Sequence, residues 1–218
     1  MSPPVVAHLV RCADGVEACR RFISSYRAHD AGCGHELVLL CKGFPADSLP
    51  QEWERSVAGV VHRRVHLPDD GFDLGAYRRA LPGLQGRHVL FLNGHAQILA
   101  VGWLDLFMRH AAPGRLIGAT ASWNSHRRDR MTACPPWLVL RRRLVSRLWR
   151  AWLSARASWD DLAPYLPFPN PHVRTNAFLL PPDLHRLVLA WPVPSGKADC
   201  HALESGRDGL SRQVLAGG

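Results

Sequence analysis

Two short stretches of the chain combine carboxylate, amide and imidazole side chains with glycine-containing turns. The first is VHLPDDGFDLGAYRRAL, residues 65–81, in which Asp73 stands at the start of a helical pattern. The second is HVLFLNGH, residues 88–95, which ends in Asn93 and His95. Each polar set follows an apolar run typical of a buried strand. Because the carboxyl ends of parallel strands and the starts of helices converge at one edge of an α/β sheet, these side chains could bind a polar ligand there.

Each stretch also has a simpler interpretation. Asp73 would be the N-cap of a helix over residues 74–80, and Asp69 and Asp70 would form an acidic turn. The Asn-Gly-His sequence would be a hairpin-like turn, although an apolar parallel strand rarely needs an amide and an ionisable ring together at its end. The sequence alone leaves both interpretations open.

The hydrophobic pattern of the first half alternates between strands and helices. This order predicts an α/β fold with a parallel sheet and right-handed crossovers, mostly parallel and flanked by helices, as in Rossmann-like domains. Ser48 is the expected N-cap of the second helix, with Gln51 as its capping-box partner. The expected strands are residues 5–10, 36–41, 60–67 and 88–92, and the expected helices are residues 16–29, 48–58 and 74–80.

The second half continues the pattern less regularly. It contains an arginine-rich amphipathic insertion at residues 137–158, within what we expect to be a single domain spanning residues 1–218. The other expected elements are helices at residues 98–110 and 183–189 and strands at residues 116–121 and 173–180.

Composition narrows the class of protein. The 218 residues are 47% hydrophobic, which is enough for a sizeable core and argues against disorder. The net charge of +9 permits an anionic partner, but no nucleic-acid-binding motif accompanies it, so no nucleic acid is expected as a partner. Only Lys42 and Lys197 among the 27 basic residues are lysines.

No targeting or spanning segment is recognisable in the sequence. The N-terminus lacks the pattern of a signal peptide, and the longest apolar stretch, residues 89–108, contains polar side chains that a bilayer would penalise. The six cysteines form no CxxC pair and no zinc-binding cluster, so we expect them to be reduced thiols. A cytoplasmic location is expected.

Four sequence blocks together resemble a known family. The blocks are FISSY, ELVLLCKGF, GFDLGAYRRAL and HVLFLNGH, and their order is similar to that in glycosyltransferases of the GT-A fold. The resemblance is closest to small bacterial family-2-like enzymes and rhamnan-synthesis-type proteins, whose corresponding blocks read roughly GFDIGAY and VLFLNDS. It covers residues 5–121 and extends more loosely through HVRTNAFLL to ESGRDGLSRQ.

The resemblance implies an enzyme that transfers a sugar from a nucleoside diphosphate sugar to a glycan or lipid-linked acceptor. The loop after the first strand would line the nucleotide, and the helix after the third strand would help to enclose it. Carried over residue by residue, the nucleotide-sugar site would comprise Arg11, Cys12, Asp73, Tyr77, Asn93 and His95.

At the end of the fourth strand the chain departs from the family pattern. An Asp-x-Asp motif there usually holds Mn²⁺ or Mg²⁺, but Asn93, Gly94 and His95 supply only an amide and an imidazole. The enzyme could bind such an ion weakly through His95, or hold the diphosphate with arginines such as Arg11. Alternatively, the fold could serve as a non-catalytic module that binds carbohydrate or a partner protein. Arg78 and Arg79 are further diphosphate candidates, or else a solvated helix face.

An inverting transferase also needs a general base to take a proton from the acceptor hydroxyl. The resemblance favours Glu204, within the ESG block, over Asp199 for this role. Glu204 could instead be an acidic residue that stabilises the start of the helix after Ser205.

Acceptor contacts are expected from two places in the second half. Thr175 and Asn176 are polar residues in an apolar strand, where a backbone-capping role is the alternative. Trp123 and Asn124 could stack on and hydrogen-bond to a sugar, unless Trp123 packs in the core.

The insertion suggests a location for the enzyme. Over residues 138–158 a helical wheel separates tryptophans from arginines, which is the composition of a helix in a membrane interface. An ordinary surface helix is the alternative. Peripheral contact through this segment would place the enzyme at the inner face of the membrane, near a lipid-linked acceptor.

Overall fold

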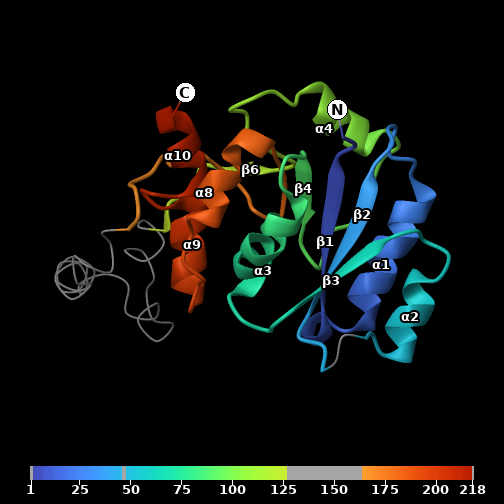
Figure 1. The fold of residues 1–218 in the computed structure, drawn as a ribbon. Helices are drawn as coiled ribbons and strands as arrows, with labels where there is room; N and C mark the ends of the chain where they lie inside the picture. The colour runs from blue at the N-terminus through green and yellow to red at the C-terminus, as the bar shows by residue number, and fades with distance from the viewer. Residues whose placement is uncertain (1, 46–47, 127–163, 218) are drawn as a thin grey trace, which may run out of the picture.

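The computed structural model describes residues 2–45, 48–126 and 164–217, and it contains a twisted sheet of six strands (Figure 1). The strand order is β3-β2-β1-β4-β8-β5, and β8 alone runs against its neighbours. The fold is therefore α/β with a mostly parallel sheet, as predicted. The strands are β1 (Val5–Arg11), β2 (Glu36–Lys42), β3 (Arg63–Leu67), β4 (Val89–Leu92), β5 (Ile117–Gly118) and β8 (Ala177–Leu180).

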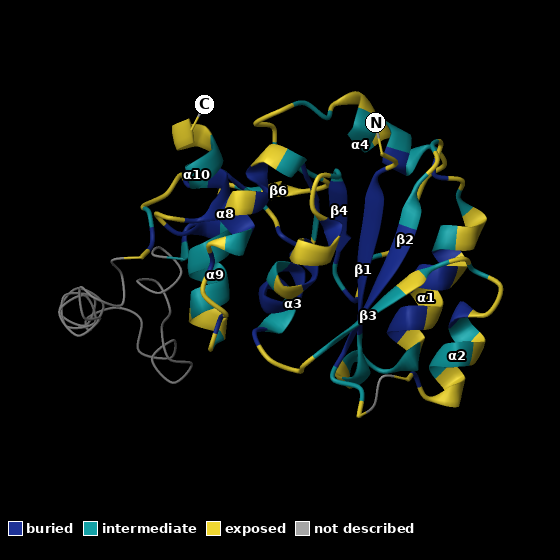
Figure 2. Ribbon diagram, in the orientation of Figure 1, coloured by how far each residue is buried: buried dark blue, intermediate teal, exposed yellow. Residues whose placement is uncertain are grey.

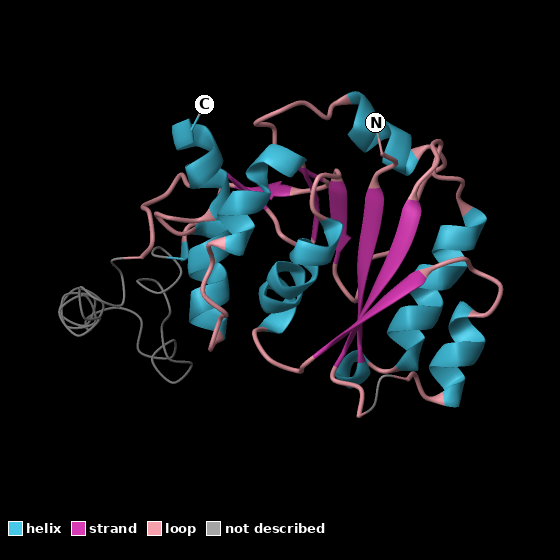
Figure 3. Ribbon diagram, in the orientation of Figure 1, coloured by secondary structure: helices cyan, strands magenta, loops and turns pink. Residues whose placement is uncertain are grey.

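Helices cover both faces of this sheet, as the secondary-structure colours in Figure 3 show. One face packs against α3 (Phe72–Ala80), α8 (His185–Leu189), α9 (Lys197–Ser205) and α10 (Leu210–Gly217). The opposite face packs against α1 (Val16–Ala28), α2 (Gln51–Val57) and α4 (Trp103–Arg109). Short 3₁₀ turns lie at Cys12–Asp14, Leu81–Leu84 and Pro182–Leu184, and β6 (Ala121–Ser122) pairs with β7 (His172–Val173) in a separate ribbon.

The central strands are continuous apolar runs because both of their faces are covered, which Figure 2 shows as dark blue. In β1, Val5 and Leu9 enter the core on the α3 face, whereas Val6 and Val10 enter the core on the α1 face. Each fully buried side chain of this size contributes about 1.5–3 kcal/mol. His8 is also fully buried in β1, and burial lowers its pKa to about 3, so this ring is neutral at pH 7.

The prediction of a helix over residues 98–110 was wrong at its start. The helix begins at Trp103, and Gly102 before it has a φ of 73°. The amides of Leu104 and Asp105 donate hydrogen bonds to the carbonyl of Ala31. Residues 93–102 are thereby left as a loop, although residues 98–108 are largely apolar.

Two predicted helix caps were also wrong. The second helix starts at Gln51 after Pro50, so Ser48 is not its N-cap. Gly71 is the N-cap of α3, with a φ of 65°, and Asp73 lies inside the first turn. Neither cap is made by a side chain, because a left-handed glycine and a proline set the entry of the chain instead.

Two predicted strands are interrupted. Residues 116–121 divide between β5, which pairs with β8, and β6, which pairs with β7. Residues 173–180 divide in the same way between β7 and β8. The chain exchanges one partner for another at these breaks, which hydrophobicity alone does not reveal. The predicted insertion at residues 137–158 lies outside the described residues. Among the described residues, no helix is long and apolar enough to cross a membrane.

Candidate functional site

The carboxyl ends of β1 and β2 place two cations side by side. Arg11 ends β1, Lys42 ends β2, and the two are register partners in the parallel ladder. Such partners project to the same face of a sheet. Leu67, at the end of β3, is the next partner of Lys42, and Asp69 follows two residues later. An acidic loop therefore meets two cations at one edge of the sheet.

Lys42 is almost completely enclosed at this edge. Its side chain is 1% exposed, and its ammonium donates a hydrogen bond of 2.9 Å to the carbonyl oxygen of Phe72. A carboxylate oxygen of Asp69 lies 3.6 Å from the same nitrogen. Burial and the neighbouring Arg11 lower the pKa of Lys42, and the carboxylates of Asp69 and Asp73 oppose that shift. An ammonium has three donors, and the carbonyl of Phe72 accepts a hydrogen bond from one of them.

Arg11 makes only long ion pairs. One terminal nitrogen lies 3.4 Å from Asp14, and the other lies 3.9 Å from Asp69. Its Nε is buried and has no hydrogen-bond partner among the described residues. Charge-assisted hydrogen bonds are normally 2.7–2.9 Å long. The guanidinium is therefore surrounded by acids without being tightly bonded to them, and an anionic ligand could compete for it.

Asp73 faces the same cations from α3. The side chain is half-buried, and burial raises the pKa of its carboxyl, while Arg11 and Lys42 oppose the shift. Asp14 and His95 exert smaller effects of opposite sign. A partly desolvated carboxyl beside cations at a strand end is common at functional sites, although a purely structural ion-pair network has the same signature.

The turn after β4 lies against the cation cluster, which consists of Arg11 and Lys42 with the carboxylates of Asp14, Asp69 and Asp73. Gly94 approaches Asp14 so closely that a Cβ atom at this position would lie 2.4 Å from an Asp14 carboxylate oxygen. His95 is 64% exposed, and its Nε2 lies 4.0 Å from that carboxylate. Asn93 is fixed through its backbone amide, which donates a hydrogen bond of 2.9 Å to the carbonyl of Asn176. The turn thus brings Asn93 and His95 to the edge where Arg11 and Lys42 lie.

The residues at this edge do not fit a divalent metal ion well. In residues 2–45, 48–126 and 164–217, no group of three or more His, Cys, Asp and Glu side chains is arranged to hold one. Asp14 and His95 approach each other to 4.0 Å, and an imidazole is a poor ligand for Mg²⁺. The weak metal role that we expected for His95 gains no support from this arrangement.

A groove runs from this turn along β4 and β8. It has a volume of about 560 Å³, and its polar lining consists of Asn93, His95, Gln97, Thr120 and Asn176. Thr120 donates a hydrogen bond of 3.2 Å to the side-chain oxygen of Asn176. The predicted nucleotide-sugar residues Asn93 and His95 and the predicted acceptor residue Asn176 are therefore brought together.

The other predicted acceptor residue of this strand region, Thr175, lies in a second cluster. Its hydroxyl donates a hydrogen bond of 2.5 Å to Glu204, which also pairs with Arg174 at 3.0 Å. His172 lies 3.7 Å from the same carboxylate, whose side chain is 17% exposed. Glu204 stands in the last turn of α9, so the expectation that it stabilises the start of the following helix was wrong.

The two clusters lie on the same side of the sheet. The charges of Asp73 and Glu204 both raise the pKa of Tyr77 and that of Cys200, although burial is the larger cause for each group. Lys42 also acts on the Cys200 thiol, with the opposite sign. Both carboxylates therefore lie within electrostatic range of residues on α3 and α9.

Asp199 has a structural role that competes with general-base catalysis. Its carboxylate accepts hydrogen bonds from the amide and hydroxyl of Ser195 and from the amide of Gly196, at 2.6–3.1 Å. These hydrogen bonds lower the pKa of Asp199 and cap α9. A carboxylate of lowered pKa is a weaker base, which counts against Asp199 in this role.

The four other predicted site residues differ in their surroundings. Tyr77 is 0% exposed, with its ring centroid 4.7 Å from that of Phe91, so it is a core residue and the expected contact with a nucleotide is corrected. Trp123 is 65% exposed, which rules out core packing and leaves its face free to stack on a ligand. Asn124 is exposed beside it. Cys12 follows Arg11 at the sheet edge and is half-buried.

The remaining arginine candidates are engaged elsewhere. Arg78 donates a hydrogen bond of 2.5 Å to the carbonyl of Trp191, and Arg79 pairs with Asp70 at 2.5 Å. Neither has a measured contact with the cluster. The interpretation of these two arginines as part of the helix surface is the one that the contacts favour.

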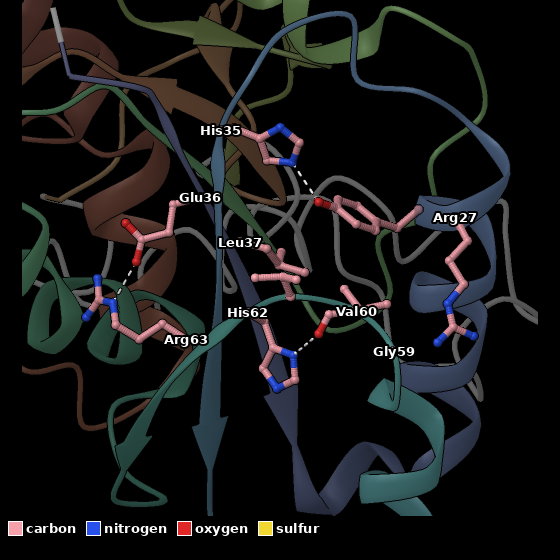
Figure 4. A pocket seen from close by; sticks show the side chains of 10 residues that line it. Arg27, His35, Glu36, Leu37, Gly59, Val60, His62 and Arg63 are labelled. Atoms are coloured by element: carbon pink, nitrogen blue, oxygen red, sulfur yellow. Dashed lines mark hydrogen bonds and ion pairs between the residues drawn. The ribbon is translucent and has the colours of Figure 1, made fainter.

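A second pocket, of about 630 Å³, lies at the opposite ends of β2 and β3 (Figure 4). Its polar side chains are paired at short distances. Tyr26 contacts His35 at 2.7 Å, Arg63 donates to Glu36 at 2.7 Å, and His62 contacts a backbone carbonyl at 2.7 Å. These groups are satisfied by one another, so the pocket offers less to a ligand than the cluster at the carboxyl ends.

Sequence reasoning missed Lys42, Asp14 and Asp69 as members of the site. Lys42 did carry a usable signal, because it is one of two lysines in an arginine-rich chain and directly follows a buried strand. Asp14 carried no such sequence signal, because its place in the site depends on the close approach of Gly94 across the sheet edge.

No protein-family model and no curated protein sequence matches the chain.

Proposed function

We propose that the chain is a glycosyltransferase of GT-A type, which transfers a sugar from a nucleoside diphosphate sugar at the edge formed by β1, β2 and β4. The observation that carries this proposal is the pair of neighbouring cations, Arg11 and Lys42, held by loose ion pairs at the carboxyl ends of adjacent parallel strands. This edge is where ligands of open α/β sheets bind. The family resemblance of the sequence blocks supports the same reaction.

In this proposal Arg11 and Lys42 hold the diphosphate of the donor. A guanidinium binds phosphate oxygens in a bidentate manner, and a buried ammonium adds a fixed point charge. Both cations would neutralise the charge that develops on the leaving nucleoside diphosphate, which is a task that a metal ion performs in related chemistry. The transfer would therefore be independent of a divalent metal.

The acceptor side of the proposed reaction is assigned to Glu204. As the acceptor oxygen attacks the anomeric carbon, the bond from that carbon to the diphosphate breaks, and Glu204 takes the proton of the hydroxyl. The hydrogen bond from Thr175 and the ion pair with Arg174 hold the carboxylate in place. This assignment applies to an inverting reaction.

A non-catalytic module that binds carbohydrate or a partner protein is the second candidate function. The absence of an Asp-x-Asp motif from the turn at Asn93 and His95 favours it. Such a module would bind a glycan without turning over a donor sugar.

Calorimetric titration of the protein with UDP, GDP and dTDP, each with Mn²⁺ and again with EDTA, tests the proposal. We expect one nucleotide to bind in EDTA, and we expect Lys42→Met to weaken that binding at least tenfold. Arg63→Met, at the opposite ends of the strands, is the matched control and should bind normally. If every nucleotide has a Kd above about 1 mM, equivalent to roughly 4 kcal/mol of binding energy, the transferase proposal fails and the binding module is favoured.

A further inference from the structure

The groove along β4 and β8 is lined by both polar and apolar side chains. Asn93 and His95 belong to its lining, and the imidazole of His95 lies 4.0 Å from the carboxylate of Asp14, which pairs with Arg11. Its apolar lining includes Leu92 from the strand and Ile98 and Trp103 from the loop and helix opposite. A site with both kinds of side chain suits a ligand that has a polar head and an apolar tail.

The size of the groove limits what can occupy it. Its volume of about 560 Å³ falls within the range of small-molecule sites, about 300–1,000 Å³. Leu99 lines the groove and is 78% exposed, so apolar surface is available to a ligand there. An apolar side chain that is so exposed gains free energy when a hydrocarbon chain covers it.

We propose that this groove binds the alkyl aglycone of a glycoside acceptor, so that the sugar head lies at Asn93, His95 and Asn176. The proposal rests on the proposed function for the identity of the bound molecule as an acceptor. Two observations carry the binding itself. The groove shares Asn93 and His95 with the candidate site, and Asn93, Asn176 and Thr120 in its lining are linked to one another by hydrogen bonds, which gathers polar groups at one place in the groove.

The test is calorimetric titration of the whole chain with methyl, hexyl and octyl β-glucosides, each below its micelle-forming concentration. Burial of each CH₂ group contributes about 0.8 kcal/mol, so octyl glucoside should bind about tenfold more tightly than hexyl glucoside. Methyl glucoside should bind too weakly to measure. An affinity that does not depend on chain length would overturn the proposal.

Leu99 and Val101, two exposed apolar residues of the same loop, provide a matched pair of variants. Leu99 lines the groove, whereas Val101 is 71% exposed and is not part of the lining. Leu99→Asp should weaken octyl glucoside at least tenfold, and Val101→Asp should leave its affinity unchanged. Because both side chains are exposed, neither change should unfold the protein, which circular dichroism would verify. Equal losses in the two variants would contradict the assignment of the groove.

The two proposals fail in different ways. If octyl glucoside binds as expected but no nucleotide does, the groove assignment is supported and the proposed transferase function is contradicted. If a nucleotide binds in EDTA but alkyl chain length has no effect, the transferase function stands and the groove assignment falls.

Discussion

The two ends of the same parallel strands differ in how their charges are paired. At the amino ends, Arg63 bonds to Glu36 at 2.7 Å and Arg64 bonds to Glu54 at 2.6 and 2.8 Å. At the carboxyl ends, the ion pairs of Arg11 are 3.4 and 3.9 Å long, although Lys42 beside it is nearly buried. Tight pairing on the surface stabilises a fold modestly, whereas loose pairing in a partly buried cluster leaves charge available to a ligand.

This contrast explains why pocket volume does not identify the site. The amino-end pocket is the larger of the two at about 630 Å³, yet its polar groups already have partners. The groove at the other end measures about 560 Å³ and includes His95, which lies 4.0 Å from Asp14, a partner of Arg11, and the Nε of Arg11 has no hydrogen-bond partner among the described residues. We therefore place the proposed site at the end of the sheet whose charges are loosely paired.

The largest expected effect is on nucleotide binding when the buried cation is removed. Lys42→Met keeps most of the length of the side chain but removes its charge, and a hydrogen bond to a charged group contributes about 1.5–3 kcal/mol. We expect the affinity for the nucleotide to fall about tenfold to a hundredfold in calorimetry. Arg63→Met should leave the affinity unchanged and reduce stability by at most about 1 kcal/mol, because its ion pair with Glu36 is exposed. If Arg63→Met weakened nucleotide binding more than Lys42→Met does, the binding site would lie at the amino ends of the strands instead.

The second expected effect is an opposite dependence of stability on pH at the two ends. Burial raises the pKa of Asp73, so the folded state favours the protonated carboxyl. Its contribution to stability is complete below the ordinary aspartate pKa of about 3.9 and is lost as the pH rises through the raised value. Relative to Asp73→Asn, the wild type should lose about 1.4 kcal/mol for every tenfold increase in proton affinity that folding causes.

Glu36 should behave in the opposite way. Hydrogen bonds from Arg63 and Arg87 lower its pKa, so its stabilising contribution is present above about pH 4.3 and is lost as the pH falls through the lowered value. Urea unfolding between pH 3 and pH 7 of the wild type, Asp73→Asn and Glu36→Gln measures both slopes. If the two variants shift the pH profile in the same direction, the proposed difference between the ends is incorrect.

A smaller effect is expected when the turn after β4 is crowded. The Cβ atom of Gly94→Ala would displace the Asp14 carboxylate, which is the end of a side chain and can move, so the loss of stability should stay below about 1 kcal/mol. Because Asp14 pairs with Arg11, nucleotide affinity should nevertheless change severalfold. At Gly83 a Cβ atom meets no atom within 4 Å, so Gly83→Ala is the control and should leave affinity unaltered. Thermal unfolding and calorimetry of both variants provide the measurement.

The smallest effect is expected at the rim of the amino-end pocket. Val61 lines that pocket and is 95% exposed, so Val61→Ser should change stability by less than about 0.5 kcal/mol and leave nucleotide affinity intact. Denaturation and nucleotide titration of this variant check the statement. A marked loss of nucleotide affinity would move the binding site to the amino ends.

The strand-helix alternation of the first half was readable from the sequence because buried parallel strands are continuous apolar runs and their helices have a 3.6-residue period. The elements β1, α1, β2 and β4 match their predicted ranges within one or two residues. Residues 98–110, by contrast, were apolar enough to predict a helix, but contacts with Ala31 and the left-handed Gly102 delay its start to Trp103. Local pattern does not contain those contacts.

The sequence by itself indicated the fold class and the edge of the sheet at which Asp73, Asn93 and His95 would meet, since each follows or adjoins a strand end, and the family resemblance added Arg11. Only the tertiary structure decided that Tyr77 is buried against Phe91 and that Lys42 joins Arg11. Strand register and helix packing set these outcomes, and both depend on residues distant in the chain. A sequence pattern predicts the helix, strand or loop on which a side chain lies, but the folded chain determines which residues surround that side chain.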